Sequence, residues 1–176
     1  GEDAYIGVNA GESLHPGFEA EIKWSVLQAG NFPNLMLAGN TTVAYYRFTD
    51  FIDDGIDYSG KNLPGTAKNT WFANCNFSPS KNIDLNFWYR NTGKMPVNDA
   101  NSDFTKPYGI TNAELKYSGK FKKIHLEIKG GAQNIFNKKY VSMLAVNAPA
   151  FGNSLPRYYY PGEPLNFYFS VLVRME

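Results

Sequence analysis

The side chains that most often do chemistry are few in this sequence and lie far apart. The only two histidines are His15 and His125, and Cys75 is the single cysteine. None of these residues stands at a spacing, with each other or with an aspartate, that suggests a metal cage. Cys75 falls on the apolar side of an alternating run, where we expect it to be inert. The sequence therefore predicts no metal site and no cofactor.

Covalent catalysis also lacks a local signature. A Ser–His–Asp arrangement on separate segments is not excluded, but no nucleophile elbow accompanies a serine. Four aspartates fall close together, and their spacing is not that of an EF-hand loop: Asp50, Asp53, Asp54 and Asp57. We interpret them as a solvated acidic loop. The expectation is a protein that is not an enzyme.

The dominant pattern of the chain is alternation with a period of two, which is typical of β-strands. It is clearest in the closing stretch, 157–176. There one side carries Leu165, Phe167, Phe169, Val171, Val173 and Met175. A tilted strand of about eleven residues spans a bilayer core, whereas soluble strands average about five or six. This stretch therefore favours a transmembrane strand over a strand of a soluble β-sandwich.

The same alternation predicts about eight strands. They cover 3–9, 18–28, 35–49, 69–77, 82–91, 108–118, 124–134 and 165–176. Within 35–49 the alternation changes phase between Tyr45 and Tyr46, which predicts a bulge. No window has a helical period, although 138–146 is compatible with one brief turn. Aromatic residues make up 16% of the chain, which fits an all-β protein with many strands.

The connections between these strands alternate in length. Short joins are expected at 29–34, 78–81 and 119–123. Longer ones are expected at 10–17, 50–68, 92–107 and 136–164. An up-and-down meander places alternate joins at opposite ends, so one end has tight turns and the other has long polar loops. That asymmetry is typical of outer-membrane barrels, which have short periplasmic turns and long outer loops.

The two sides of the predicted strands have different environments. Aromatic residues on the apolar sides are placed to form interfacial girdles: Trp24, Trp71, Tyr89, Tyr117 and Phe167. Charged residues on the opposite sides cannot face lipid, where each costs roughly 2–4 kcal/mol. We expect them to face a wet lumen or to pair across it. With 17 basic and 16 acidic residues, the chain has no net field that would attract nucleic acid.

Four segments, in order along the chain, resemble the TonB-dependent outer-membrane receptor family. The segment GAQNIFNKKYV at 131–141 resembles the "NLF(D/N)KxY" signature of the penultimate strand. RYYYPGEPLNFY at 157–168 resembles the "Y-x-P-G-x-x-R-x-F-Y" start of the last strand, with Leu165 and Asn166 where an arginine is usual. LPGTAK at 63–68 resembles "xPGTPxH". NAG at 9–11 with GFEAE at 17–21 resembles "NAGxxxxxGxELE".

This resemblance implies that residues 1–176 form the C-terminal part of a 22-stranded transmembrane β-barrel. The fold is then an all-β antiparallel up-and-down meander, and the plug domain and earlier strands are absent. Family members usually end on an aromatic residue, whereas this chain ends with Met175 and Glu176. The implied function is active transport across the bacterial outer membrane, of a ferric siderophore or another iron complex, energised through TonB. The 98–102 loop also looks like that of members that take ferric siderophores.

The resemblance also implies partners and ligand contacts. The partners are outer-membrane lipid, the remainder of the barrel and the plug, the TonB complex through the missing N-terminal part, and a small-molecule metal chelate. Contacts should come from the long outer loops and the upper lumen, because arginine binds anionic oxygens and tyrosine stacks and hydrogen-bonds. The candidates are His15, Arg90, Arg157, Tyr158 and Tyr159. The tyrosines have an alternative role in the outer aromatic girdle.

Two other functions remain open at this point. The chain is compatible with a small autonomous eight-stranded outer-membrane barrel that has an adhesin or structural role. It is also compatible with a membrane-embedded hydrolase, which requires an Asp, His and Ser cluster at the loop end. A closed eight-stranded barrel is nearly filled by its own side chains.

Overall fold

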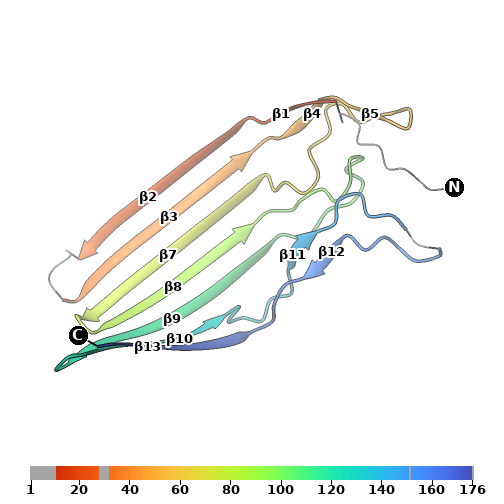
Figure 1. Cartoon of the computed structure of the whole chain (residues 1–176). Helices are drawn as coiled ribbons and strands as arrows, with labels where there is room; N and C mark the ends of the chain where they lie inside the picture. The colour runs from red at the N-terminus through yellow and green to blue at the C-terminus, as the bar shows by residue number, and fades with distance from the viewer. Residues whose placement is uncertain (1–10, 28–31, 151, 176) are drawn as a thin grey trace.

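The computed structural model describes residues 11–27, 32–150 and 152–175, and its main feature is one seven-stranded antiparallel sheet. The strands follow one another in space in the order β13-β10-β9-β8-β7-β3-β2 (Figure 1). They are β2 (Gly17–Leu27), β3 (Asn34–Ala44), β7 (Asn69–Ser80), β8 (Ile83–Thr92), β9 (Tyr108–Phe121), β10 (Ile124–Gln133) and β13 (Asn166–Met175). The predicted up-and-down meander is confirmed. The predicted strand at 3–9 lies outside the described residues.

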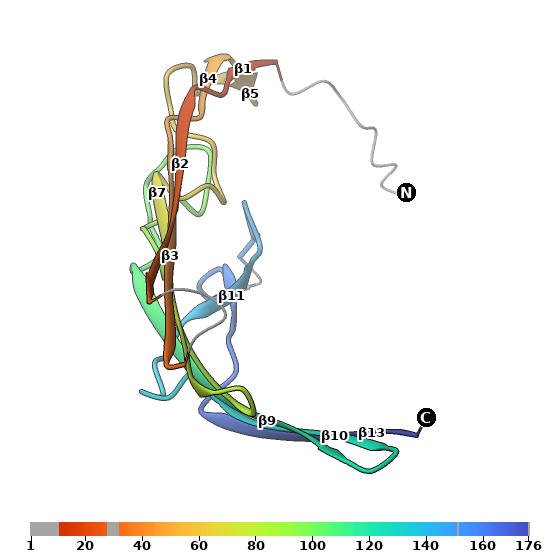
Figure 2. The same cartoon turned by 90° about the vertical axis from the view of Figure 1, so that its left-hand side faces the viewer.

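The sheet is an open, curved wall. Figure 2 shows it arching from β2 to β13, with β11 (Val141–Leu144) on its hollow side. Within the described ranges, β2 pairs only with β3 and β13 only with β10. The described part of the chain is therefore an arc of a barrel wall rather than a closed eight-stranded barrel.

The strand register separates apolar from polar side chains. Residues that pair across an antiparallel ladder lie on the same face. One complete row across the sheet is apolar: Trp24, Leu37, Cys75, Phe87, Ala113, Ala132 and Phe167. A neighbouring row on the other face is mostly polar: Ser25, Met36, Asn76, Asn86, Glu114, Gly131 and Tyr168. The sequence alternation thus builds one apolar face and one polar face.

The apolar face is open to its surroundings. Phe167 and Ile22 are 76% and 69% exposed. Trp71 and Tyr89, from adjacent strands, bring their ring centroids to 4.8 Å near the loop end. Trp24 and Tyr117 lie toward the turn end, as expected for a second girdle. Among the described residues, no helix is long and apolar enough to cross a bilayer.

The two ends of the sheet differ as predicted. Residues 81–82 join β7 to β8, and Lys122 and Lys123 join β9 to β10. The predicted turns were placed too early and too broadly. β7 continues to Ser80 through an irregularity after Phe77, and β9 continues to Phe121. The long loops 45–68, 93–107 and 134–165 lie at the opposite end (Figure 1).

The predicted bulge within 35–49 was wrong. The chain leaves the main sheet after Ala44, and β4 (Arg47–Asp50) pairs instead with β1 (Glu12–Leu14). At the break, the Tyr45 N–H donates to the Pro16 carbonyl, with an N···O distance of 2.8 Å. The phase change therefore marks the point where one strand ends and another begins.

The long loops contain small hairpins of their own. β5 (Ile52–Asp53) pairs with β6 (Ile56–Asp57). β11 pairs with β12 (Tyr159–Pro161), inside a segment predicted to be a plain loop. The brief helical turn considered for 138–146 is replaced by β11. Short strands of two to four residues carry too little alternation to be read from sequence.

Candidate functional site

The polar face carries a network of paired groups. Lys116 Nζ lies 2.6 Å from Asp84 Oδ2, and Ser78 Oγ donates to Asp84 Oδ1 at 2.5 Å. On the next row, the Tyr168 hydroxyl donates to Glu114 Oε2 at 2.7 Å. These groups pair along the wall, whereas the expectation was that the charges face a wet lumen or pair across it. The contacts of Asp84 with Ser78 and Lys116 join the neighbouring strands β7, β8 and β9, and the bond between Tyr168 and Glu114 reaches from β13 over β10 to β9.

Asn134 is the anchor of the longest loop. It follows β10 directly, is 2% exposed and has a left-handed φ of 50°. Its Nδ2 donates to the carbonyls of Lys138 and Glu163, both at 2.9 Å, and its Oδ1 accepts from the Lys138 N–H at 2.8 Å. One side chain thus ties the beginning of the 134–165 loop to its end. Asparagine suits this position, since it tolerates the left-handed region and both donates and accepts.

Tyr140 is held in place from two sides. Its ring lies against Gly162, where a Cβ would collide with it. The Gly162 N–H donates to the Tyr140 carbonyl at 2.8 Å, and the Tyr108 ring centroid lies 5.2 Å from that of Tyr140. Residues 134–140 (NIFNKKY) and 160–164 (YPGEP) therefore contact each other in the folded chain. Both segments carried the family resemblance.

Two cavities meet at Tyr140. The first, which we call the lumen cavity, has a volume of about 360 Å³. It lies between the polar face and the long loop, and its lining includes Trp88, Arg90, Asn112, Tyr140 and Glu163. Since Tyr140 and Glu163 belong to the loop that carries β11, the polar face is the hollow side seen in Figure 2.

The second cavity, which we call the loop cavity, has a volume of about 830 Å³. It lies between loops 93–107 and 134–165. Its lining combines basic and aromatic side chains: Phe104, Lys106, Lys138, Lys139, Tyr140 and Tyr159. Both volumes fall within the range of small-molecule sites, roughly 300–1,000 Å³. The loop end therefore offers two places, both lined by Tyr140, where a small molecule can bind.

The structure brings two of the five predicted ligand residues to these cavities. Arg90 lines the lumen cavity, and Tyr159 lines the loop cavity. Arg157 and Tyr158 precede Tyr159 in the chain, but neither lines either cavity. The Tyr158 carbonyl accepts from the Ala145 N–H at 2.6 Å.

His15 lies apart from both cavities. It stands between β1 and β2, where its ring centroid is 4.7 Å from that of Tyr46. Its Nε2 is 2.8 Å from Ser13 Oγ. No group of three or more histidine, cysteine, aspartate or glutamate residues gathers closely enough to hold a metal ion anywhere in the described ranges.

Sequence reasoning missed most of the loop-cavity residues. Lys138, Lys139 and Tyr140 lie within a motif that was read only as a family signature. Phe104 and Lys106 carry no local signal, because their place depends on how two loops meet. Asn134 is the signal that could have pointed to Lys138, Lys139 and Tyr140. An asparagine directly after a strand commonly begins a structured turn.

Hydrogen bonds of the Asn101 and Asn147 side chains join the three long loops. The Asn62 N–H donates to Asn101 Oδ1 at 2.8 Å, and Asn101 Nδ2 donates to the Asn62 carbonyl at 2.9 Å. Asn147 Nδ2 donates to Asp99 Oδ2 at 2.6 Å, and the Asp99 N–H donates to Asn147 Oδ1 at 3.0 Å. Val97, two residues before Asp99, is 2% exposed, and its carbonyl accepts from the Asn147 N–H at 3.0 Å. The loops thus form one packed unit.

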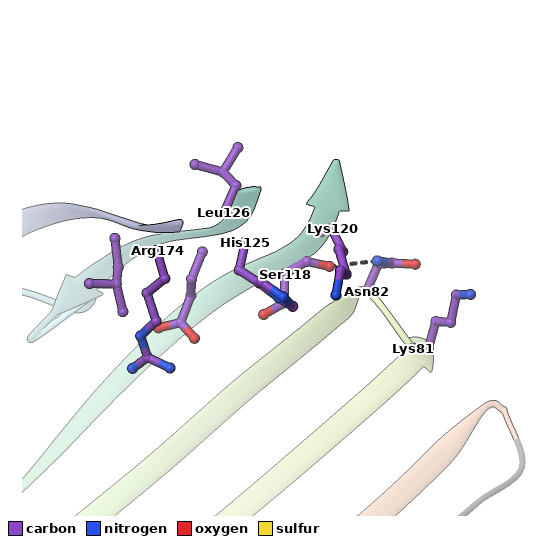
Figure 3. A pocket seen from close by; sticks show the side chains of 10 residues that line it. Lys81, Asn82, Ser118, Lys120, His125, Leu126 and Arg174 are labelled. Carbon is purple, nitrogen blue, oxygen red and sulfur yellow. Dashed lines mark hydrogen bonds between the residues drawn. The ribbon is translucent and has the colours of Figure 1, made fainter. Parts of the chain in front are cut away.

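A third cavity, of about 580 Å³, lies at the opposite, turn end of the polar face (Figure 3). Lys81, His125, Leu126 and Arg174 are among the residues that line it, and the Leu126 side chain points to the opposite side of the sheet from His125. Asn82 Nδ2 donates to the Ser118 carbonyl at 2.5 Å, which ties the β7–β8 turn to β9. His125 lies on the polar face of β10.

Comparison with known proteins identifies the family of this chain. The family model described as "TonB dependent receptor-like, beta-barrel" matches residues 1–135. The chain belongs to this family. The predicted resemblance, the all-β barrel fold and the location in the bacterial outer membrane are confirmed.

Solved structures of receptors share the fold. The siderophore receptor PiuA from Acinetobacter baumannii matches with a TM-score of 0.68 and 16% identity, over 93% of this chain and 22% of PiuA. The closed form of the ferric-catecholate import receptor Fiu from E. coli K12 matches with a TM-score of 0.63 and 20% identity, over 92% of this chain and 20% of Fiu. The ferric preacinetobactin receptor BauA from A. baumannii matches with a TM-score of 0.60 and 14% identity, over 92% of this chain and 26% of BauA.

This chain of the TonB-dependent receptor family thus spans about a fifth to a quarter of the length of the solved receptors. The family and these structures are receptors rather than enzymes. Within the family fold, the short turns correspond to the periplasmic end and the long loops to the outer end. The lumen and loop cavities therefore lie on the outer side.

Proposed function

We propose that this chain is the C-terminal part of the barrel of a receptor that imports an iron complex, most simply a ferric siderophore, through the outer membrane. The observation that carries the proposal is the pair of cavities at the outer end of the wall that share Tyr140. Arg90 on the polar face lines one of them, and Tyr159 in the long loop lines the other. A ligand that enters from outside meets the loop cavity first and the lumen cavity second.

The role of this chain in transport is binding and guidance, not covalent chemistry. Arg90 offers a planar fork for anionic oxygens, and Tyr159 offers a ring and a hydroxyl. Arg157, Tyr158 and His15 stand outside the two cavities in this conformation, and we retain them as candidate contacts of the outer loops. TonB-coupled energy would act through the plug and the rest of the protein.

The open edges of the arc support the remainder of the barrel as its partner. An unpaired strand edge leaves backbone N–H and C=O groups unsatisfied, which costs several kcal/mol each in lipid. We therefore propose that further strands of the same receptor complete the ladders of β2 and β13, and that a plug domain fills the lumen beside the polar face.

Uptake of radioactive iron by cells tests the proposed function. The full-length receptor is produced in iron-starved cells that lack other iron receptors, and ⁵⁵Fe-loaded chelates are supplied. We expect saturable uptake that disappears when TonB is deleted while surface binding remains. Arg90→Ala should reduce uptake, whereas Lys81→Ala, at the turn end, should not. Uptake that is absent for every ferric chelate would reject the proposal.

A further inference from the structure

We propose that a groove on the membrane-facing side of the wall binds an acyl chain of lipopolysaccharide, the lipid of the outer leaflet. The groove has a volume of about 420 Å³, and we call it the trough. Small residues form its floor and larger apolar ones its walls: Ala113, Gly130, Ala132, Phe87, Leu115 and Phe167. These residues lie on the apolar face, so the trough is separate from the lumen and loop cavities. The inference goes beyond the proposed function, because import of a ligand does not require it.

The first row of the trough crosses four strands. Ala113 of β9 and Ala132 of β10 are cross-strand partners and lie side by side. Phe87 of β8 pairs with Ala113, and Phe167 of β13 pairs with Ala132, so an exposed ring stands at each end of the row. Neighbouring strands are about 4.8 Å apart, which places the two ring-bearing strands roughly 14 Å apart. The low floor between them is therefore wide enough to admit a hydrocarbon chain.

Gly130 extends the floor by a second row toward the turn end. It lies between Leu115 of β9 and Phe169 of β13, which are its cross-strand partners. A Cβ at position 130 would find its nearest neighbour, the Phe169 ring, 3.8 Å away. The glycine is therefore not required by close packing within the wall, and the space above it is open. Residues i and i+2 of a strand are roughly 6.6 Å apart, so the two rows form a floor that continues along the strands.

Two tyrosines on the apolar face fix the depth of the trough in the membrane. The Tyr89 hydroxyl lies against Gly109, which is nearer the loop end than Thr111, the cross-strand partner of Tyr89. The Tyr117 hydroxyl lies against Gly119, nearer the turn end. Tyrosines at a bilayer surface keep their rings in the apolar region and their hydroxyls toward water. The two tyrosines therefore mark the outer and inner limits of the apolar belt, and both rows of the trough fall between them.

The position of the trough along the strands selects the outer leaflet. Gly130 and Ala132 lie within the last four residues of β10, which ends at Gln133. Phe167 is the second residue of β13, which begins at the loop end. In this family the long loops are on the outer side, so this part of the wall meets the lipids of the outer leaflet. In a bacterial outer membrane that leaflet consists mainly of lipopolysaccharide, whose acyl chains supply the hydrocarbon.

Close packing holds the chain in the trough. Lipid and wall are both apolar, so no hydrophobic force brings them together, and dispersion contacts decide which part of the wall retains a chain. On an even surface a chain touches the protein on one side only. Between Phe87 and Phe167 it touches the floor and both walls. An empty trough would lose these contacts, so the occupied trough is favoured.

Native mass spectrometry of the full-length receptor tests the proposal. The receptor is extracted from outer membranes in a mild detergent, and the lipids that stay bound are identified and counted. We expect bound lipopolysaccharide on the wild-type receptor. Gly130→Leu and Ala132→Leu fill the floor, and each should reduce the bound lipopolysaccharide about fivefold. Phe87→Ala removes one wall instead, and it should act in the same direction.

Ala73→Leu is the matched control. Ala73 is an exposed residue of β7 on the same apolar face, paired with Tyr89, and it does not line the trough. The added leucine should therefore leave the bound lipopolysaccharide unchanged. Thermal unfolding verifies that each variant is folded. Uptake of ⁵⁵Fe by Gly130→Leu should equal that of the wild-type receptor, because the trough lies on the other side of the wall from the lumen cavity.

Three results would overturn the inference. Retention of lipopolysaccharide that is absent, or equal in the wild-type receptor and the filled variants, would show that the trough is not its site. Loss of a phospholipid instead of lipopolysaccharide from the filled variants would assign the trough to a different lipid. A wild-type dimer that becomes monomeric when the trough is filled would make it a contact between two copies of the receptor. The proposed function is tested separately, since ⁵⁵Fe uptake does not depend on any of these results.

Discussion

The ring of Tyr140 occupies the space beside the α-carbon of Gly162 that any side chain at position 162 would need. Two segments far apart in the sequence thereby meet, and the Gly162 N–H completes the contact at the Tyr140 carbonyl, 2.8 Å away. Because Tyr140 lines both cavities, this contact helps to set their shape.

Gly162→Ala should therefore displace Tyr140. We expect a loss of about 1–3 kcal/mol in the free energy of unfolding, the usual cost of overpacking, and weaker chelate binding. Thermal unfolding and chelate titration of the full-length receptor measure the two effects. Gly130→Ala is the control, since its new Cβ would find no neighbour closer than 3.8 Å. Equal behaviour of the two variants would show that Tyr140 has room to move.

Asn134→Ala should release the 134–165 loop. The change removes the partners of the Lys138 N–H and of the Lys138 and Glu163 carbonyls, and each of these part-buried hydrogen bonds contributes about 0.5–1.5 kcal/mol. We expect faster amide hydrogen exchange at both ends of this loop, with β7 and β8 unchanged. Asn153→Ala, at an exposed position in the same loop, should leave exchange as it was. Unchanged exchange in Asn134→Ala would mean that the loop has another anchor.

The seven long strands could be predicted from sequence because each alternates over about ten residues, and the polar and apolar faces followed directly. The approximate positions of the turns could be predicted, but their first and last residues could not. Ser80 is of a type common in turns, and Phe121 follows Ser118 and Gly119, which are also common there. Only cross-strand pairing extends β7 and β9 to these residues. Register depends on partners that a single strand does not specify.

The candidate site was predicted only where it lies on a strand or in a motif. Arg90 was found because alternation placed it on the lumen side. Lys106 was missed, because its approach to Lys138 depends on two loops packing together. His15 was selected as a loop histidine, and the structure instead places its ring beside Tyr46. Tertiary contacts between loops have no periodic signal in the sequence.

Asn101→Gly should loosen loop 93–107 from loop 45–68. Asn101 has a φ of 53°, which glycine adopts without strain, so this substitution removes the side-chain bonds to Asn62, Asn98 and Asp99 without adding backbone strain. We expect faster hydrogen exchange at residues 61–63 and 98–102. Asn101→Ala should be worse, because it adds backbone strain of about 1–2 kcal/mol to the same loss. A smaller effect for alanine than for glycine would contradict the assigned role of the side chain.

The Asp84–Lys116 pair should stabilise the wall through mutual coupling. Each side chain is 32% exposed, so water screens the pair only in part. Asp84→Asn and Lys116→Met each leave one charge without its partner, and each should destabilise the receptor by about 1–3 kcal/mol. The double variant should lose less than the sum, by a coupling energy of about 0.5–1.5 kcal/mol. Urea unfolding of the four proteins in a common detergent measures this cycle. Strict additivity would show that Asp84 and Lys116 act independently, with Asp84 held mainly by the Ser78 hydroxyl.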